Sequence, residues 1–184
     1  MKVKQLVRND TAIALKNLGL DVKGKILEGE EHKNELCSLF WQEYKDTLNT
    51  SSIKELLVHY ADMLEVIRTL MVMSKTNVKD FDLGKNPAMQ WYKKSSPNND
   101  KLFDARLDIL QKFSELLTIK TEAIKDQLND MLMSFKSLVE AHGLTFAQVE
   151  KTRRTMFKKL GGFNQGIYLE SVSKTKTNTT AYSV

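Results

Sequence analysis

Acidic residues and a histidine recur at helical spacing between residues 35 and 71. Glu43 and Asp46 are three positions apart, which places them close together on one face of a helix. Four further polar residues, separated by four, three and three positions, would lie on successive turns of a second helix: Glu55, His59, Asp62 and Glu65. Carboxylates that converge from two helices repel each other unless a cation or a proton offsets their charge. The pattern therefore indicates a cation site, although charged residues beside an apolar stripe more often form only the solvated flank of a helix.

Two amphipathic runs, residues 35–48 and 53–71, would position these polar groups. Each run has apolar residues at helical spacing, namely Leu36, Leu39, Phe40, Tyr44 and Leu48 in the first and Leu56, Leu57, Tyr60, Leu64, Ile67 and Leu70 in the second. A short polar break between them, residues 49–52, predicts a turn. If the resulting hairpin closes, Glu43 and Asp46 face His59 and Asp62.

Composition narrows the class of protein. The chain has 184 residues, of which 41% are hydrophobic, enough for one compact domain with a core. No run is long enough to cross a bilayer and no signal peptide is evident, so we expect a soluble, cytoplasmic protein with no membrane partner. The net charge of +5 favours anionic ligands without indicating nucleic acid. The single cysteine, Cys37, lies in an apolar run and is expected to be a buried structural thiol.

The rest of the chain also reads mainly at helical period, which predicts an all-α fold in a single helical domain over residues 1–172. The first helical hairpin covers residues 33–73, a loop covers 74–100 and a second hairpin covers 101–142 with a break near residues 118–121. A C-terminal helix and turn occupy 144–172, with Thr145 as N-cap and Gln148 as its capping-box partner, and residues 173–184 are predicted to be a mobile tail. Trp91 and Tyr92 in the loop would either stack on a base or anchor the loop by packing.

Four segments, in order, resemble motifs of the MazG and phosphoribosyl-ATP pyrophosphohydrolase superfamily of all-α nucleotide pyrophosphohydrolases. The segment LVRND at residues 6–10 is similar to the family's Leu-Val-Arg-Asp-Lys start, and QEYKD at 42–46 to its EExxE helix. HYADMLEVI at 59–67 is similar to the family's ExxD helix, and GLT at 143–145 followed by LGGFNQGIYL at 160–169 to its RGGF ending. The resemblance covers about residues 4–72 and 130–170. It implies a helical bundle that ends in a Gly-Gly-Phe turn.

The segment between these motifs suggests a duplicated hairpin. Asp130-Met131-Leu132 repeats the order of Asp62-Met63-Leu64, which would make Glu115 and Asp130 the second copy of Glu43 and Asp62. In that copy, Thr118 and Gln127 replace the other two acidic ligands of the family. The alternative is a merely similar amphipathic helix pair. Since the family pairs hairpins between subunits, one chain with two hairpins would hold both halves of such a bundle.

The resemblance also implies roles for individual residues. The metal ligands would be Glu43, Asp46, His59 and Asp62, holding Mg²⁺ or Mn²⁺, with Glu43 and Asp62 catalytic if the chain is an active enzyme. Magnesium accepts imidazole nitrogen poorly, so His59 weakens the site for that ion and suits manganese better. Glu55 and Glu65 would be extra carboxylates on the same stripe. Nucleotide binding would fall to Arg8, Arg153, Arg154 and Lys158, together with Trp91 and Tyr92.

Three functions remain open at this point. The first is capture of a phosphorylated nucleotide, such as a signalling nucleotide, by a MazG-like fold whose metal site has eroded. The second is metal-dependent hydrolysis of a nucleoside triphosphate between its α and β phosphates. The third is a helical protein-interaction module without a ligand. Exposed apolar hairpin faces predict a homodimer or a higher homo-oligomer in each case.

Overall fold

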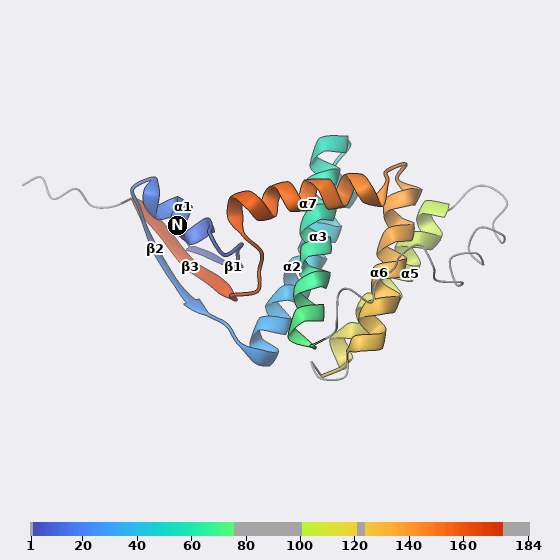
Figure 1. Cartoon of the computed structure of the whole chain (residues 1–184), viewed down its shortest axis with the longest axis horizontal. Helices are drawn as coiled ribbons and strands as arrows, with labels where there is room; N and C mark the ends of the chain where they lie inside the picture. Colours follow the sequence, from blue (N-terminus) through green and yellow to red (C-terminus); the bar gives the residue numbers. More distant parts are fainter. Residues whose placement is uncertain (1, 76–100, 121–123, 175–184) are drawn as a thin grey trace, which may run out of the picture.

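The computed structural model describes residues 2–75, 101–120 and 124–174. In chain order its elements are β1 (Lys2–Leu6), α1 (Thr11–Asn17), β2 (Leu20–Ile26), α2 (Gly29–Asn49), α3 (Ile53–Met73), α5 (Lys101–Thr118), α6 (Lys125–Ala141), α7 (Phe146–Leu160) and β3 (Ile167–Lys174). The sheet and α1 lie at one end of the molecule, the α2–α3 hairpin in the middle and the α5–α6 hairpin at the other end (Figure 1). Helix α7 lies across α3 (Figure 1). The prediction of an all-α fold is confirmed in part, because the described residues are mainly helical.

The helices follow the apolar periodicity of the sequence. The first predicted hairpin corresponds to α2 and α3, although α2 already begins at Gly29. The second corresponds to α5 and α6, and α5 ends at Thr118, within the predicted break. Local capping agrees as well: the side chain of Ser52 caps α3, and Thr145 and Gln148 form the predicted capping box of α7.

Buried side chains of the two hairpins pack into a common core. The rings of Phe40 and Phe113 stack at 5.2 Å between α2 and α5. The rings of Tyr60 and Phe135 meet edge to face at 5.7 Å between α3 and α6. Cys37 is 2% exposed in this core, and burial raises the pKa of its thiol to about 11, so the thiol is unreactive at neutral pH, as expected for a structural cysteine. The core therefore fixes α2 and α3, which carry the candidate site, against a second pair of helices.

The chain is not all-α, because a three-stranded antiparallel sheet with the order β1-β3-β2 joins its two ends. Strand β3 pairs with β2 from Leu20–Lys174 to Ile26–Ile167, and with β1 at Leu6–Tyr168. Most residues of β1 and β2 are exposed or half-buried. Such strands show no alternation of buried and exposed apolar residues, so their sequences read as connections rather than as strands.

The C-terminal boundary also differs from the prediction. The sequence predicts a mobile tail from Ser173, whereas Ser173 pairs with Asp21 and β3 continues to Lys174. The remainder of the predicted tail, residues 175–184, and residues 76–100 of the predicted loop lie outside the described residues. None of the described helices combines the length and apolar character needed to cross a membrane.

Gly166 lies in the turn that leads from α7 into β3, beside the end of β2. Its φ is +63°, in the left-handed region, and a Cβ at this position would overlap the backbone carbonyl of Leu27. We expect Gly166→Ala to lower the free energy of unfolding by about 2 kcal/mol, because it adds left-handed strain to an overlap with backbone that cannot rotate away. Urea unfolding followed by circular dichroism measures this change. Gly19→Ala is the control: its φ is +74° and its Cβ would meet nothing within 4 Å, so it should cost only the strain, about 1 kcal/mol.

Candidate functional site

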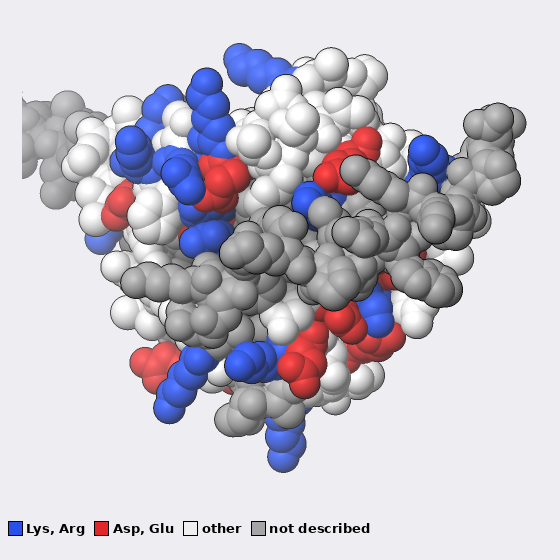
Figure 2. All heavy atoms as spheres, turned by 45° about the vertical axis from the view of Figure 1, so that its right-hand side comes forward, with Lys and Arg blue, Asp and Glu red and all other residues white. Residues whose placement is uncertain are grey.

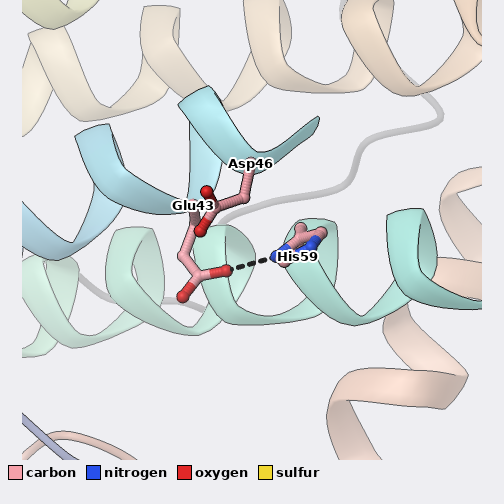
Figure 3. Close-up of side chains that lie close together, drawn as sticks. All are labelled: Glu43, Asp46 and His59. Carbon is pink, nitrogen blue, oxygen red and sulfur yellow. Dashed lines mark hydrogen bonds and ion pairs between the residues drawn. The ribbon is translucent and has the colours of Figure 1, made fainter. Parts of the chain in front are cut away.

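Glu43, Asp46 and His59 meet near the turn end of the α2–α3 hairpin (Figure 3). One carboxylate oxygen from each acid and one ring nitrogen of His59 all lie within 4.8 Å of one another. The Nδ1 of His59 donates a hydrogen bond to Oε2 of Glu43 at 2.7 Å. The three side chains are half-buried, so they are neither fully solvated nor sealed in the core. The structure thus brings together three of the four residues that the sequence assigns to a metal.

Burial shapes the electrostatics of this cluster. It raises the pKa of Glu43, and the nearby charge of Asp62 adds to that rise, while the hydrogen bond from His59 opposes it. Asp46 is oriented from its own helix, since Nε2 of Gln42 donates to both of its carboxylate oxygens at 3.0 and 3.1 Å. A bound cation close to Glu43 would offset the cost of ionising it. The cluster can therefore hold either a proton or a cation.

Asp62, the fourth predicted ligand, is bound by Arg8 instead. Both Nε and Nη2 of Arg8 donate to Oδ1 of Asp62, at 3.0 and 2.6 Å, and Nη1 donates to the carbonyl of Gly161 at 2.7 Å. The guanidinium also lies 4.9 Å from the centroid of the Phe163 ring. Burial raises the pKa of Asp62, and the charge and hydrogen bonds of Arg8 oppose that rise. All three guanidinium nitrogens are thus engaged, and Arg8 joins the N-terminal segment to α3 and to the Gly-Gly-Phe turn.

Arg153 and Arg154, the next predicted phosphate ligands, also have protein partners. Arg153 is 7% exposed and bridges Glu65 on α3 to Glu150 on its own helix. Arg154 is exposed and pairs with Glu150. Glu65, predicted as an extra carboxylate for the metal, therefore belongs to this ion network rather than to the cluster. Of the predicted phosphate ligands, only Lys158 is an exposed cation for which the described residues show no ion pair.

The other predicted polar residues lie away from the cluster. Glu55 accepts a hydrogen bond from Oγ1 of Thr50 at the hairpin turn. In the second hairpin, Lys112 pairs with both Glu115 and Asp130, and Thr118 donates to the carbonyl of Glu115. Among the described residues, the only group with metal-ligand geometry is the one formed by Glu43, Asp46 and His59. The duplication of the hairpin stays a prediction; in the structure, Glu115 and Asp130 both lie beside Lys112. Trp91 and Tyr92 lie outside the described residues.

Comparisons of the chain with protein-family models, with curated proteins and with solved structures find no match. The resemblance to the pyrophosphohydrolases therefore remains an inference from the motifs. Among the described residues on the face drawn in Figure 2, acidic and basic side chains are interspersed. The charges of these described residues alone do not mark a binding surface for a polyanion.

Proposed function

We propose that the chain captures a phosphorylated nucleotide at a divalent cation held by Glu43, Asp46 and His59. The observation that carries the proposal is the convergence of their three ligand atoms within 4.8 Å from two helices. A cation bound there supplies positive charge for phosphate oxygens, which matters because Arg8 and Arg153 are occupied by carboxylates. The MazG-like motifs in the sequence support a nucleotide as the ligand and a MazG-like bundle as the fold.

The donor set fits a transition ion better than magnesium. Two carboxylates and one imidazole offer mixed oxygen and nitrogen ligands, which manganese and zinc accept, whereas magnesium prefers oxygen alone. The 2.7 Å contact between His59 Nδ1 and Glu43 Oε2 is close to the separation of about 3 Å between adjacent ligands in an octahedral site. For both residues to bind one ion, the Nδ1 proton of His59 would have to leave or move to Nε2, and small rotations of the two side chains would then bring the ligand atoms into place. We therefore propose Mn²⁺ rather than Mg²⁺ as the ion that supports binding.

Capture is favoured over hydrolysis by the position of Asp62. The family motif implies four ligands, but Arg8 neutralises Asp62 and holds its Oδ1. Three ligands with two charges bind an ion more weakly than four ligands with more charge. The second candidate, hydrolysis between the α and β phosphates, rests on Glu43: burial raises its pKa despite the opposing hydrogen bond from His59, which makes it a stronger base than an ordinary carboxylate.

The discriminating experiment incubates the protein with nucleoside triphosphates, cyclic nucleotides and NAD-related nucleotides in the presence of Mn²⁺ or Mg²⁺. The protein is recovered by gel filtration and denatured by heat, and the released compounds are separated by chromatography. Capture predicts release of an intact nucleotide in stoichiometric amount. Hydrolysis predicts a monophosphate and pyrophosphate in the mixture before heating. If no compound in the panel is retained or hydrolysed, both functions are rejected.

Glu43→Gln tests the cation site itself. We expect this variant to bind Mn²⁺ at least about ten-fold more weakly, because it loses a charged ligand that faces Asp46 and His59. Electron paramagnetic resonance of free Mn²⁺ during a titration measures the affinity. Glu35→Gln is the matched control, since it removes the same charge from α2 two turns earlier, outside the cluster. Equal losses in the two variants would show that Mn²⁺ responds to net charge and not to this cluster.

A further inference from the structure

Strand β2 forms one edge of the three-stranded sheet, because the strand order is β1-β3-β2. It runs along the outer side of the sheet, whereas β1 lies on the side nearer the helices (Figure 1). All residues of β2 from Lys23 to Ile26 are exposed, and the others are exposed or half-buried. Within the described parts of the chain, no strand pairs with the outer edge of β2. The backbone N–H and C=O groups on that edge are therefore available to a further strand.

The two edges of the sheet differ in how well they could accept another strand. The β1 edge is irregular: its register with β3 shifts between Lys2 and Gln5, and Lys4 has a φ of +49°, in the left-handed region. A bulge of this kind on an edge strand hinders pairing with a further strand. In the ladder between β2 and β3, the residue without an opposite neighbour is Glu170 of β3, and no described residue of β2 has a positive φ. The β2 edge is therefore the regular one.

The sequence of β2 is complementary to itself when two copies run antiparallel about Val22. In that register Val22 lies opposite Val22 of the other copy, and Asp21 of each copy lies opposite Lys23 of the other. Opposite charges at directly opposed positions stabilise an antiparallel pair of strands. Asp21 and Lys23 are both exposed, and the described residues include no ion-pair partner for either of them. The two side chains are thus available to pair between copies.

Exposed apolar side chains would meet at both ends of the paired strands. Ile26, the last residue of β2, is 65% exposed, and Leu18, two residues before β2, is 76% exposed. Both are four positions from Val22, so the same register brings Ile26 of each copy beside the turn that contains Leu18 of the other. Association would thus remove from water two of the most exposed large hydrophobic side chains of the described chain.

We propose that two copies of this chain associate through their β2 edges and form one six-stranded antiparallel sheet with the order β1-β3-β2-β2-β3-β1. Both outer strands of this sheet are then β1, whose bulge at Lys4 disfavours further pairing, so the assembly closes as a dimer and does not extend into a fibre. The dimer uses no residue of the cluster formed by Glu43, Asp46 and His59. Failure of nucleotide capture therefore leaves this proposal standing, and the reverse also holds.

The association should be weak, because a strand of seven residues extends only about 24 Å and gives a small interface. We expect a Kd between about 10 µM and 1 mM, which sedimentation velocity over that range of protein concentration measures. A wild-type chain that stays monomeric at about 1 mM would overturn the proposal.

Exchange of the paired charges tests the contact between Asp21 and Lys23. Asp21→Lys and Lys23→Asp should each raise the Kd at least about ten-fold, because each replaces two attractive pairs by two repulsive ones. The double variant should return to within about three-fold of wild type, because its charges are exchanged but complementary again. Asp126→Lys is the matched control: it makes the same change of charge at an exposed residue of α6 and should leave the Kd unchanged. A double variant that does not recover, or an equal effect of Asp126→Lys, contradicts the proposed register.

Val22→Cys tests the position of the two-fold axis. Directly opposed residues of an antiparallel pair have Cα atoms about 4.5 to 5.5 Å apart, a separation that a disulfide spans. The natural cysteine, Cys37, is 2% exposed and should not cross-link. We expect mild oxidation to convert Val22→Cys into a covalent dimer on a non-reducing gel and to leave Val3→Cys, on β1, monomeric. A cross-link at position 3 and not at position 22, or a dimer in solution that cross-links at neither, would place the interface elsewhere and overturn the proposal.

Discussion

Arg8→Met should lower the free energy of unfolding by about 3 to 5 kcal/mol at pH 7, the usual cost of removing one partner of a buried ion pair. Arg8 is 4% exposed and the side chain of Asp62 is 15% exposed, so solvent cannot replace the lost guanidinium. The carbonyl of Gly161 loses its donor too. Urea unfolding followed by circular dichroism measures the change.

The loss of stability in Arg8→Met should be smaller at lower pH. Burial already raises the pKa of Asp62, and loss of Arg8 raises that pKa further, so the folded variant binds a proton more tightly than the unfolded chain does. A group of this kind stabilises the fold below its unfolded pKa, and that contribution is lost as the pH rises through its folded pKa. The deficit of Arg8→Met should therefore shrink as the pH falls from 7 towards 4.

Two further variants separate burial from charge. Adding Asp62→Leu to Arg8→Met should restore much of the stability, because no unpaired carboxylate then remains in the core. Arg154→Met removes an arginine whose side chain is 69% exposed, so it should cost less than about 1 kcal/mol. If Arg8→Met costs no more than Arg154→Met, the Arg8–Asp62 pair is screened by water and does not organise the site.

The sequence predicts the helices well because their cause is local. Apolar residues recur along α2 and α3 with the helical period, and the capping residues Ser52 and Thr145 lie at the predicted starts. The sheet depends instead on pairing between distant segments: Leu6 pairs with Tyr168 across the whole domain. Nothing in either segment alone identifies its partner, because strand pairing depends on backbone hydrogen bonds that the whole fold brings together.

The same distinction applies to the site. Glu43, Asp46 and His59 meet because a helical hairpin with a short turn forces residues on facing turns together, which periodicity can indicate. The partners of Arg8 and Arg153 could not be predicted in this way, because the Arg8 pair depends on how the N-terminal segment lies against α3 and the Arg153 pair on how α7 crosses α3. The family motifs assign Arg8 and Asp62 to a ligand site without showing that they neutralise each other. The available signal for this pairing was that Arg8 and Asp62 carry opposite charges and that each follows apolar residues in the sequence.

Glu150→Gln should lower the free energy of unfolding by about 3 kcal/mol at pH 7, and this loss should disappear in acid. Burial alone would raise the pKa of Glu150, but the hydrogen bonds and charges of Arg153 and Arg154 outweigh it and hold the pKa at about 2, against an ordinary value of 4.5. Its side chain is only 18% exposed, so that difference acts on folding with little screening, at about 1.4 kcal/mol for each pKa unit.

The sign follows from the lowered pKa. A carboxylate whose folded pKa lies below its unfolded pKa stabilises the fold above the unfolded value, and that contribution is lost as the pH falls through the folded value. Wild type should therefore lose its advantage over Glu150→Gln between about pH 4.5 and pH 2, which urea unfolding at a series of pH values measures. Glu140→Gln, which removes an exposed carboxylate paired with Lys136 at 3.9 Å, should show a difference below about 1 kcal/mol throughout. The charge of Glu150 titrates between about pH 4.5 and pH 2, whereas packing does not. If the loss of unfolding free energy in Glu150→Gln stays constant down to about pH 2, packing and not the charge of this carboxylate holds α7 to α3.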